Sequence, residues 1–163
     1  MTVDDLRILG DRLRYGPVPM QAKKVYAYLG HIQDLLEIIP GSVAIRGSVL
    51  DACAGCDLPT QKEAIPQFIQ EQLTAYIESR RKGRETSVFI LDAAEVIVRY
   101  RLPMTFLYSL AGDTHAIVLC VAWGGSPRGS KLPSYVRFDP NDITDFFERT
   151  LGEQCIHQAS MED

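Results

Sequence analysis

The chain has 163 residues, 46% hydrophobic and 23% charged, with a formal net charge of −4 at pH 7. This length supports one core, so we expect a single α/β domain over residues 1–163, and the acidic balance argues against direct nucleic-acid binding. No signal-peptide pattern or membrane-length apolar run is visible. The expected location is therefore cytoplasmic, with reduced cysteines and no membrane contact.

Helical spacing of apolar residues predicts two helices in the N-terminal part of the chain, over residues 3–13 and 20–39. Pro40 is expected to end the second of them. Residues 42–50 are short and rich in β-branched side chains, which predicts a strand interrupted or ended near Gly47.

The middle of the chain carries a helix signal followed by a strand signal. Thr60 and Glu63 have the spacing of a capping box, which predicts a helix that runs to about residue 81. Pro66 falls in its first turn, where proline is tolerated. The uninterrupted apolar run over residues 88–91 is typical of a strand buried on both faces.

The rest of the chain continues this alternation of helices and strands. Strands that alternate with helices predict a three-layer α/β sandwich with a mostly parallel sheet. The expected elements are one helix, or two joined near Pro103, over residues 93–112; strands over 115–123 and 134–138; a last helix over 139–151 closed by Gly152; and a frayed end over 153–163.

The glycine-rich segment that follows the strand over residues 115–123 resembles a phosphate-binding P-loop. In a P-loop the lysine follows the second glycine directly and the loop leads into a helix. Here Ser130 precedes Lys131, and Pro133 disfavours a helix. We interpret residues 121–133 as a connection between two strands.

Asp92 and Glu95 form a pattern similar to Walker B, an apolar strand followed by acidic residues that hold magnesium. A buried strand that ends in a helix-capping aspartate gives the same pattern. The loop expected after the first strand, residues 51–60, contains no lysine. The sequence therefore predicts a degenerate P-loop-like layout, with Asp92 and Glu95 as the only weak catalytic candidates.

Cys53 and Cys56 have the C-x-x-C spacing of a redox dithiol or of half a zinc site. A zinc site needs two further ligands, and the other cysteines and the histidines are scattered. Neighbouring Asp51 and Asp57 oppose a thiolate. We expect no metal and no cofactor, and a thiol redox or sensor role stays open as an alternative.

Four basic residues are candidates for contact with a partner protein: Arg99, Arg101, Arg128 and Lys131. The first two can equally be the solvated side of a helix. The stretches 104–112 and 145–151 carry more apolar residues than one buried face requires, which indicates either a partner-binding face or a thick core.

Residues 87–139 resemble the C-terminal half of small accessory proteins from BREX-type phage-exclusion systems. The resemblance rests on two buried strands, VFILD and AIVLCVAW, the intervening VRYRLPMTFLYSL, and the loop GGSPRGSKLP. It implies a non-catalytic subunit with a degenerate nucleotide-binding fold that docks onto a phosphatase-fold protein, a DNA methyltransferase or an ATPase. The alternative is a nucleotide-binding or nucleotide-hydrolysing domain that uses Asp92 and Glu95.

Overall fold

The computed structural model describes residues 25–55, 57, 59–112, 114–121, 140–152 and 155–158. The predicted helix over residues 3–13, the predicted strand over 134–138 and the glycine-rich segment after Val121 lie outside these residues. No helix within the described ranges is long and apolar enough to cross a membrane.

The described strands form one sheet in the order β2-β3-β4-β1-β5, and every pairing in it is parallel. The expected α/β class is confirmed, with a sheet that is parallel throughout the described strands. The strands are β1 (Val25–Leu29), β2 (Ala44–Ser48), β3 (Ser87–Asp92), β4 (His115–Val121) and β5 (Ile156–Gln158).

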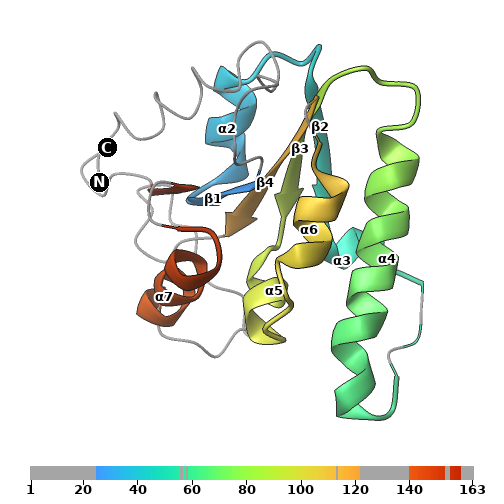
Figure 1. The fold of residues 1–163 in the computed structure, drawn as a ribbon. Helices are drawn as coiled ribbons and strands as arrows, with labels where there is room; N and C mark the ends of the chain where they lie inside the picture. The colour runs from blue at the N-terminus through green and yellow to red at the C-terminus, as the bar shows by residue number, and fades with distance from the viewer. Residues whose placement is uncertain are drawn as a thin grey trace.

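Helices lie on both faces of this sheet. Figure 1 shows α2 on one side and α4 with α6 on the other, which gives the expected three layers. The helices are α2 (Ile32–Ile38), α3 (Val49–Ala52), the 3₁₀ turn η1 (Lys62–Ala64), α4 (Ile65–Arg80), α5 (Glu95–Arg99), α6 (Thr105–Leu110) and α7 (Pro140–Thr150).

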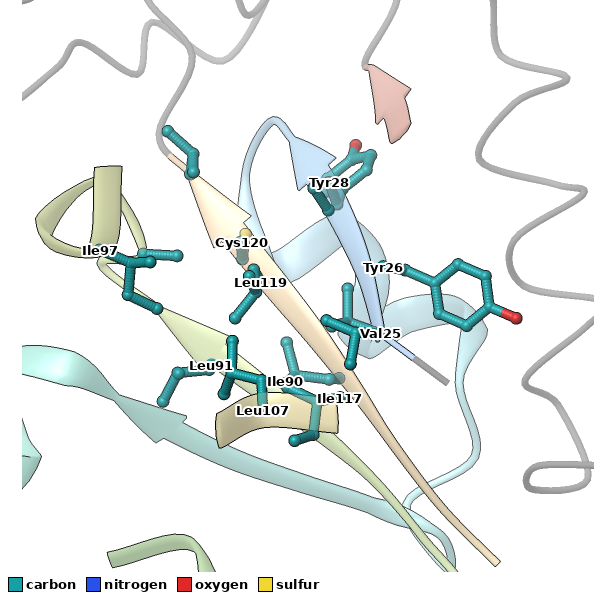
Figure 2. Close-up of a cluster of buried hydrophobic side chains, with 14 of the residues drawn as sticks. Val25, Tyr26, Tyr28, Ile90, Leu91, Ile97, Leu107, Ile117, Leu119 and Cys120 are labelled. Carbon is teal, nitrogen blue, oxygen red and sulfur yellow. The ribbon is translucent and has the colours of Figure 1, made fainter. Parts of the chain in front are cut away.

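The core lies where β3, β4 and β1 meet the helices. Side chains of Leu91, Ile117 and Leu119 lie on one face of the sheet with Ile97 of α5 and Leu107 of α6 (Figure 2), and all of them are buried. The strands are buried on both faces, as their uninterrupted apolar sequences predict.

The predicted helix over residues 20–39 is wrong, because its described part is a strand followed by a short helix. β1 and α2 are separated only by Gly30 and His31. All five residues of β1 are buried, and a strand buried on both faces is apolar at every position. Joined to the apolar positions of α2, this run produces a false helical spacing.

The expected frayed end over residues 153–163 is wrong for Ile156–Gln158, which form β5. This strand pairs with β1, with Ala27 opposite Ile156 and Tyr28 opposite His157. Ile156 and His157 are both buried. Three residues are too few to show a periodic pattern, so the strand is specified by its neighbour rather than by its own sequence.

β2 ends at Ser48, one residue after Gly47, which agrees with the predicted end near this glycine. A Cβ atom at Gly47 would lie 2.7 Å from the rings of Phe89 and Tyr76. The glycine therefore marks a close approach of two rings to the strand, which is one of the reasons for glycine inside a strand.

The helix signals in the middle of the chain are confirmed in part. α4 carries Pro66 in its first turn as predicted, but it starts at Ile65, after η1, and no side chain caps either start. The capping box of Thr60 and Glu63 is therefore not the start of this helix. Residues 93–112 form two helices, and Gly152 follows α7 with a φ of 92°.

The apolar stretches 104–112 and 145–151 supply a thick core. Leu107, Leu110 and Phe147 are buried. Among the described residues, the large hydrophobic side chain that stands exposed is Leu50 of α3, at 52%. The interpretation of these stretches as a partner-binding face is not supported.

At the amino ends of β3 and β4, Ser87 Oγ lies 2.7 Å from His115 Nδ1. Burial lowers the pKa of His115, and the nearby Arg81 guanidinium lowers it further. The folded state therefore favours neutral His115, whereas in the unfolded chain a histidine has its usual pKa of about 6.5.

The protein should become less stable as the pH is lowered, because the folded state resists protonation of His115. Below about pH 6.5 the unfolded chain binds a proton that the folded chain resists, so the free energy of unfolding decreases until the folded pKa is passed. Chemical denaturation at pH 7.5 and 5.5 measures this loss. His115→Gln is expected to lose less, and equal losses in both proteins would contradict the assignment.

Candidate functional site

The point where the connections of the sheet diverge lies at the carboxyl ends of β1 and β4. From β1 the chain crosses to β2 at one edge of the sheet, and from β4 it crosses over β1 to β5 at the other. Open parallel sheets bind ligands outside the carboxyl ends of their strands at such a point. The candidate site therefore consists of the loops and side chains at these strand ends.

The loop after β1 consists of Gly30 and His31 alone. The Gly30 N–H donates to Val121 O at 3.0 Å, and Gly30 O accepts from Cys120 Sγ at 3.6 Å. His31 Nδ1 caps α2 by accepting from Gln33 N at 3.1 Å. A P-loop needs a run of backbone N–H groups aimed at phosphate oxygens, and this loop is too short to supply one.

This loop corrects the position at which a P-loop was sought. The first strand was expected over residues 42–50, whereas β1 precedes it. The loop that follows β1 also contains no lysine. The loop after β1, like the loop after β2, therefore has no Walker A sequence.

Tyr28 closes the space beneath Gly30. The side chain of Tyr28 is fully buried, and its hydroxyl donates to Asp34 Oδ2 at 3.1 Å. Its ring lies 2.8 Å from the place that a Cβ atom of residue 30 would take. Tyr28 and Cys120 both lie near the arrowheads of their strands in Figure 2. The carboxyl end of β1 is filled by protein atoms.

Asp92 and Glu95 come to the same edge from β3, as the sequence predicts. Asp92 Oδ1 accepts from Ala93 N at 2.9 Å, and Ala94 N donates to Cys120 O at 3.1 Å. Ala93 has a φ of 58°, a left-handed conformation that is strained for a residue with a side chain. Glu95 is only 2% exposed. The segment after β3 is thereby held against β4.

The pKa of the Cys120 thiol reflects the acidic residues near the carboxyl ends of the strands. Burial raises the pKa of its thiol well above the usual range, and the carboxylates of Asp92, Glu95 and Asp34 raise it further. The three acidic residues thus act on one buried point, and the thiol stays protonated. Sequence reasoning missed Asp34, because its place depends on recognising β1.

The acidic side chains at the ends of β1 and β3 disfavour a phosphate group next to Cys120. Three carboxylates repel a phosphate group, and the positive end of α2 is already used by the side chains of His31 and Asp34. Within the described residues, no group of three His, Cys, Asp or Glu side chains could hold a metal ion.

Two of the other predicted site residues lie on the surface, and two cannot be placed. Arg99 and Arg101 are exposed; the Arg99 guanidinium lies 5.9 Å from the Tyr100 ring centroid, and Arg101 has a φ of 50°. Arg128 and Lys131 lie outside the described residues. The partner-binding role of these four residues remains a prediction.

The structure also brings together charged residues that sequence reasoning missed, at the carboxyl end of β2. Arg46, Tyr76 and Arg80 line a hollow of about 240 Å³ with Asp51, Ser48 and Asp92. These residues come from β2, α3, α4 and β3. Since they are up to 46 positions apart in the sequence, no local pattern could have predicted the hollow.

The cysteines differ sharply in accessibility. Cys53 is half-buried, whereas Cys120 and Cys155 are buried, and Cys56 lies outside the described residues. The predicted dithiol of Cys53 and Cys56 therefore lies partly outside the described residues.

Iodoacetamide at pH 8 should alkylate Cys53 well before Cys120 in the folded protein. Only the thiolate reacts, and each unit by which a pKa rises lowers the thiolate fraction about tenfold. Peptide mass spectrometry after timed quenching gives both rates, and unfolding in urea is the control in which both cysteines should react. Equal rates in the folded protein would contradict the burial of Cys120.

Comparisons with known proteins add little to this geometry. No protein-family model matches the sequence, and no curated protein matches it significantly. Among solved structures, the ADP form of the ORC2 protein of Aeropyrum pernix is similar over 95% of this chain and 45% of that chain, with a TM-score of 0.43 and 14% identity. A likeness this weak carries no functional argument. The resemblance to phage-exclusion accessory proteins gains no support from these comparisons.

Proposed function

We propose that this chain is a non-catalytic binding subunit that docks onto a larger protein partner. The observation that supports this most strongly is the state of the carboxyl edge of the sheet. There, Tyr28 fills the end of β1, a two-residue loop replaces a phosphate cradle, and the charges of Asp92, Glu95 and Asp34 add to burial in raising the pKa of the Cys120 thiol.

Each of these features opposes nucleotide chemistry by a separate physical route. The two-residue loop supplies no run of N–H donors, and the Gly30 N–H is used by Val121 O. The carboxylates add electrostatic repulsion for phosphate oxygens. A fold without its usual ligand site still offers exterior surfaces to other proteins, and function then lies in those surfaces.

The setting we propose is a multi-protein bacterial anti-phage complex. This part of the proposal rests on the resemblance of residues 87–139 to accessory proteins of phage-exclusion systems. The partner would then be a phosphatase-fold protein, a DNA methyltransferase or an ATPase.

Purification of the tagged chain from its native cells tests the proposal. Mass spectrometry would identify the co-purifying protein, and co-expression of the pair should give a complex of fixed stoichiometry in light scattering after size-exclusion chromatography. If the chain elutes alone from native cells and forms no such complex, the proposal is wrong.

One observation favours a second candidate, a nucleotide-binding domain that uses Asp92 and Glu95. Both carboxylates do reach the edge where parallel sheets bind ligands. In this candidate they would hold a magnesium ion and the nucleotide phosphates would follow the ion. Calorimetry with magnesium and ATP separates it from the binding-subunit proposal.

A third candidate is a thiol sensor that uses Cys53 and Cys56. A variant with both Cys53→Ser and Cys56→Ser should behave as the parent protein under oxidant if the binding-subunit proposal is right. A change of mobility or oligomeric state that only the parent shows under oxidant would favour the sensor.

A further inference from the structure

Three side chains on one wall of the hollow at the end of β2 contact one another. Asp51 Oδ2 accepts from the Tyr76 hydroxyl at 2.8 Å and from Arg80 Nη2 at 3.2 Å. The Arg80 guanidinium also lies over the Tyr76 ring, 4.7 Å from its centroid. Stacking and ion pairing together hold the Arg80 side chain in place before any partner arrives.

Side chains of Tyr76, Arg80 and Arg84 contact backbone atoms in and next to β2. Arg80 Nη1 reaches Arg46 O at 3.4 Å, and Arg84 Nη1 donates to Ser42 O at 3.2 Å. Ser48 N donates to the Tyr76 hydroxyl at 3.2 Å. An added strand would have to displace these contacts, so a partner at this edge meets side chains rather than free backbone groups.

Arg46 is the arginine of the hollow that no described carboxylate pairs with. Its side chain is exposed, and its guanidinium has no hydrogen-bond or ion-pair partner within the described part of the chain. Asp51 is engaged by Arg80, and Asp92 is half-buried with one oxygen bound to Ala93 N. The Arg46 guanidinium is therefore available to pair with a carboxylate from a partner, and guanidinium–carboxylate pairs can form two parallel hydrogen bonds.

The balance of charge in the hollow disfavours a polyanion. Two arginines and two aspartates line it, so its formal charge is zero. Nucleic acid requires a row of cations, whereas one carboxylate requires one free guanidinium.

Leu50 is an exposed apolar residue next in the chain to Asp51, which lines the hollow. It precedes Asp51 in α3, and it is the exposed large hydrophobic side chain among the described residues. Protein interfaces combine tyrosine and arginine anchors with apolar contact.

We infer that this hollow docks an acidic segment of a partner protein, with a carboxylate paired to Arg46 and an apolar side chain against Leu50. The inference rests on the proposed function, since it names the surface by which the subunit holds its partner. It adds Arg46 and Leu50 to the four basic residues that the sequence offered for this role.

Nuclear magnetic resonance of the ¹⁵N-labelled full chain tests the chemistry of the hollow directly. The probes are two blocked peptides, acetyl-Leu-Glu-Leu-Glu-amide and acetyl-Leu-Lys-Leu-Lys-amide. The acidic peptide should shift the Arg46 Nε–H signal and the Leu50 amide signal, and Arg46→Gln should weaken its binding about tenfold or more. Lys62→Gln, which removes an exposed cation on η1, should leave binding unchanged.

Three results would overturn the inference. They are equal shifts with both peptides, equal effects of Arg46→Gln and Lys62→Gln, or inorganic phosphate that shifts the same signals at lower concentration than the acidic peptide. Both substitutions are at exposed positions, and an unchanged melting temperature verifies that each variant is folded.

The purified complex separates this inference from the proposed function. Arg46→Glu should lower the affinity for the partner at least about tenfold, since it turns attraction into repulsion. If Arg46→Glu leaves the affinity unchanged, the inference is wrong and the proposed function stands. If no partner exists, the proposed function is wrong, and the peptide titration still decides the chemistry of the hollow.

Discussion

Gly47→Ala is expected to lower the free energy of unfolding by about 1–3 kcal/mol, the usual cost of overpacking. The new Cβ would lie 2.7 Å from the Phe89 and Tyr76 rings. Phe89 is buried, and the Tyr76 hydroxyl is held by Asp51, so neither ring moves freely. Relief of glycine backbone entropy gives back only about 0.5–1 kcal/mol. Urea denaturation measures the difference.

A second substitution isolates the ring contact at Gly47. Phe89→Leu removes the ring edge nearest the new methyl group, so the double variant should be more stable than the sum of the two single losses predicts. Gly41→Ala is the matched control, since a Cβ there meets nothing within 4 Å. A Gly47→Ala protein as stable as the parent would contradict the close approach of Phe89 to β2.

Gly30→Ala should be at least as damaging, because it acts on the closed end of β1. Its Cβ would lie 2.8 Å from the ring and hydroxyl of Tyr28, which is fully buried. The ring can yield only by leaving Asp34, so a lost charged hydrogen bond of about 1.5–3 kcal/mol adds to an overpacking cost of about 1–3 kcal/mol. Thermal and urea unfolding both measure this loss.

Tyr28→Phe separates the two parts of that cost. It removes the hydrogen bond to Asp34 and leaves the ring, so it should lose less stability than Gly30→Ala. Gly41→Ala again serves as the control and should change stability by less than about 1 kcal/mol. If Gly30→Ala proved as harmless as Gly41→Ala, the end of β1 would be open rather than filled.

Short local patterns in the sequence were sufficient to predict β3, β4 and α7. β3 and β4 follow from uninterrupted apolar runs, and α7 from Pro140 at its start and Gly152 after its end. Each of these signals lies within a short stretch of the chain, so the sequence alone reveals it.

β1 and β5 were missed because their structure depends on distant partners. β1 is buried on both faces and runs into α2 with only Gly30 and His31 between them, so its apolar residues extend the helical spacing. β5 has three residues and exists by pairing with β1. Neither signal is visible without the sheet.

The candidate site was predictable only in the part that follows a recognisable strand. Asp92 and Glu95 follow a recognisable strand, and the structure does bring them to the carboxyl edge. Asp34 joins them only because β1 lies beside β4. Arg46 and Arg80 meet through the packing of α4 against the end of β2, and side-chain contacts between distant segments leave no pattern in one sequence.

Calorimetric titration of magnesium and ATP into the purified full chain tests most directly whether the carboxyl edge is closed to nucleotides. A filled β1 end and three carboxylates predict no saturable heat at millimolar nucleotide and no rise in melting temperature. Saturable binding of one nucleotide per chain that Asp92→Asn abolishes would contradict this, and would make the chain a nucleotide-binding domain.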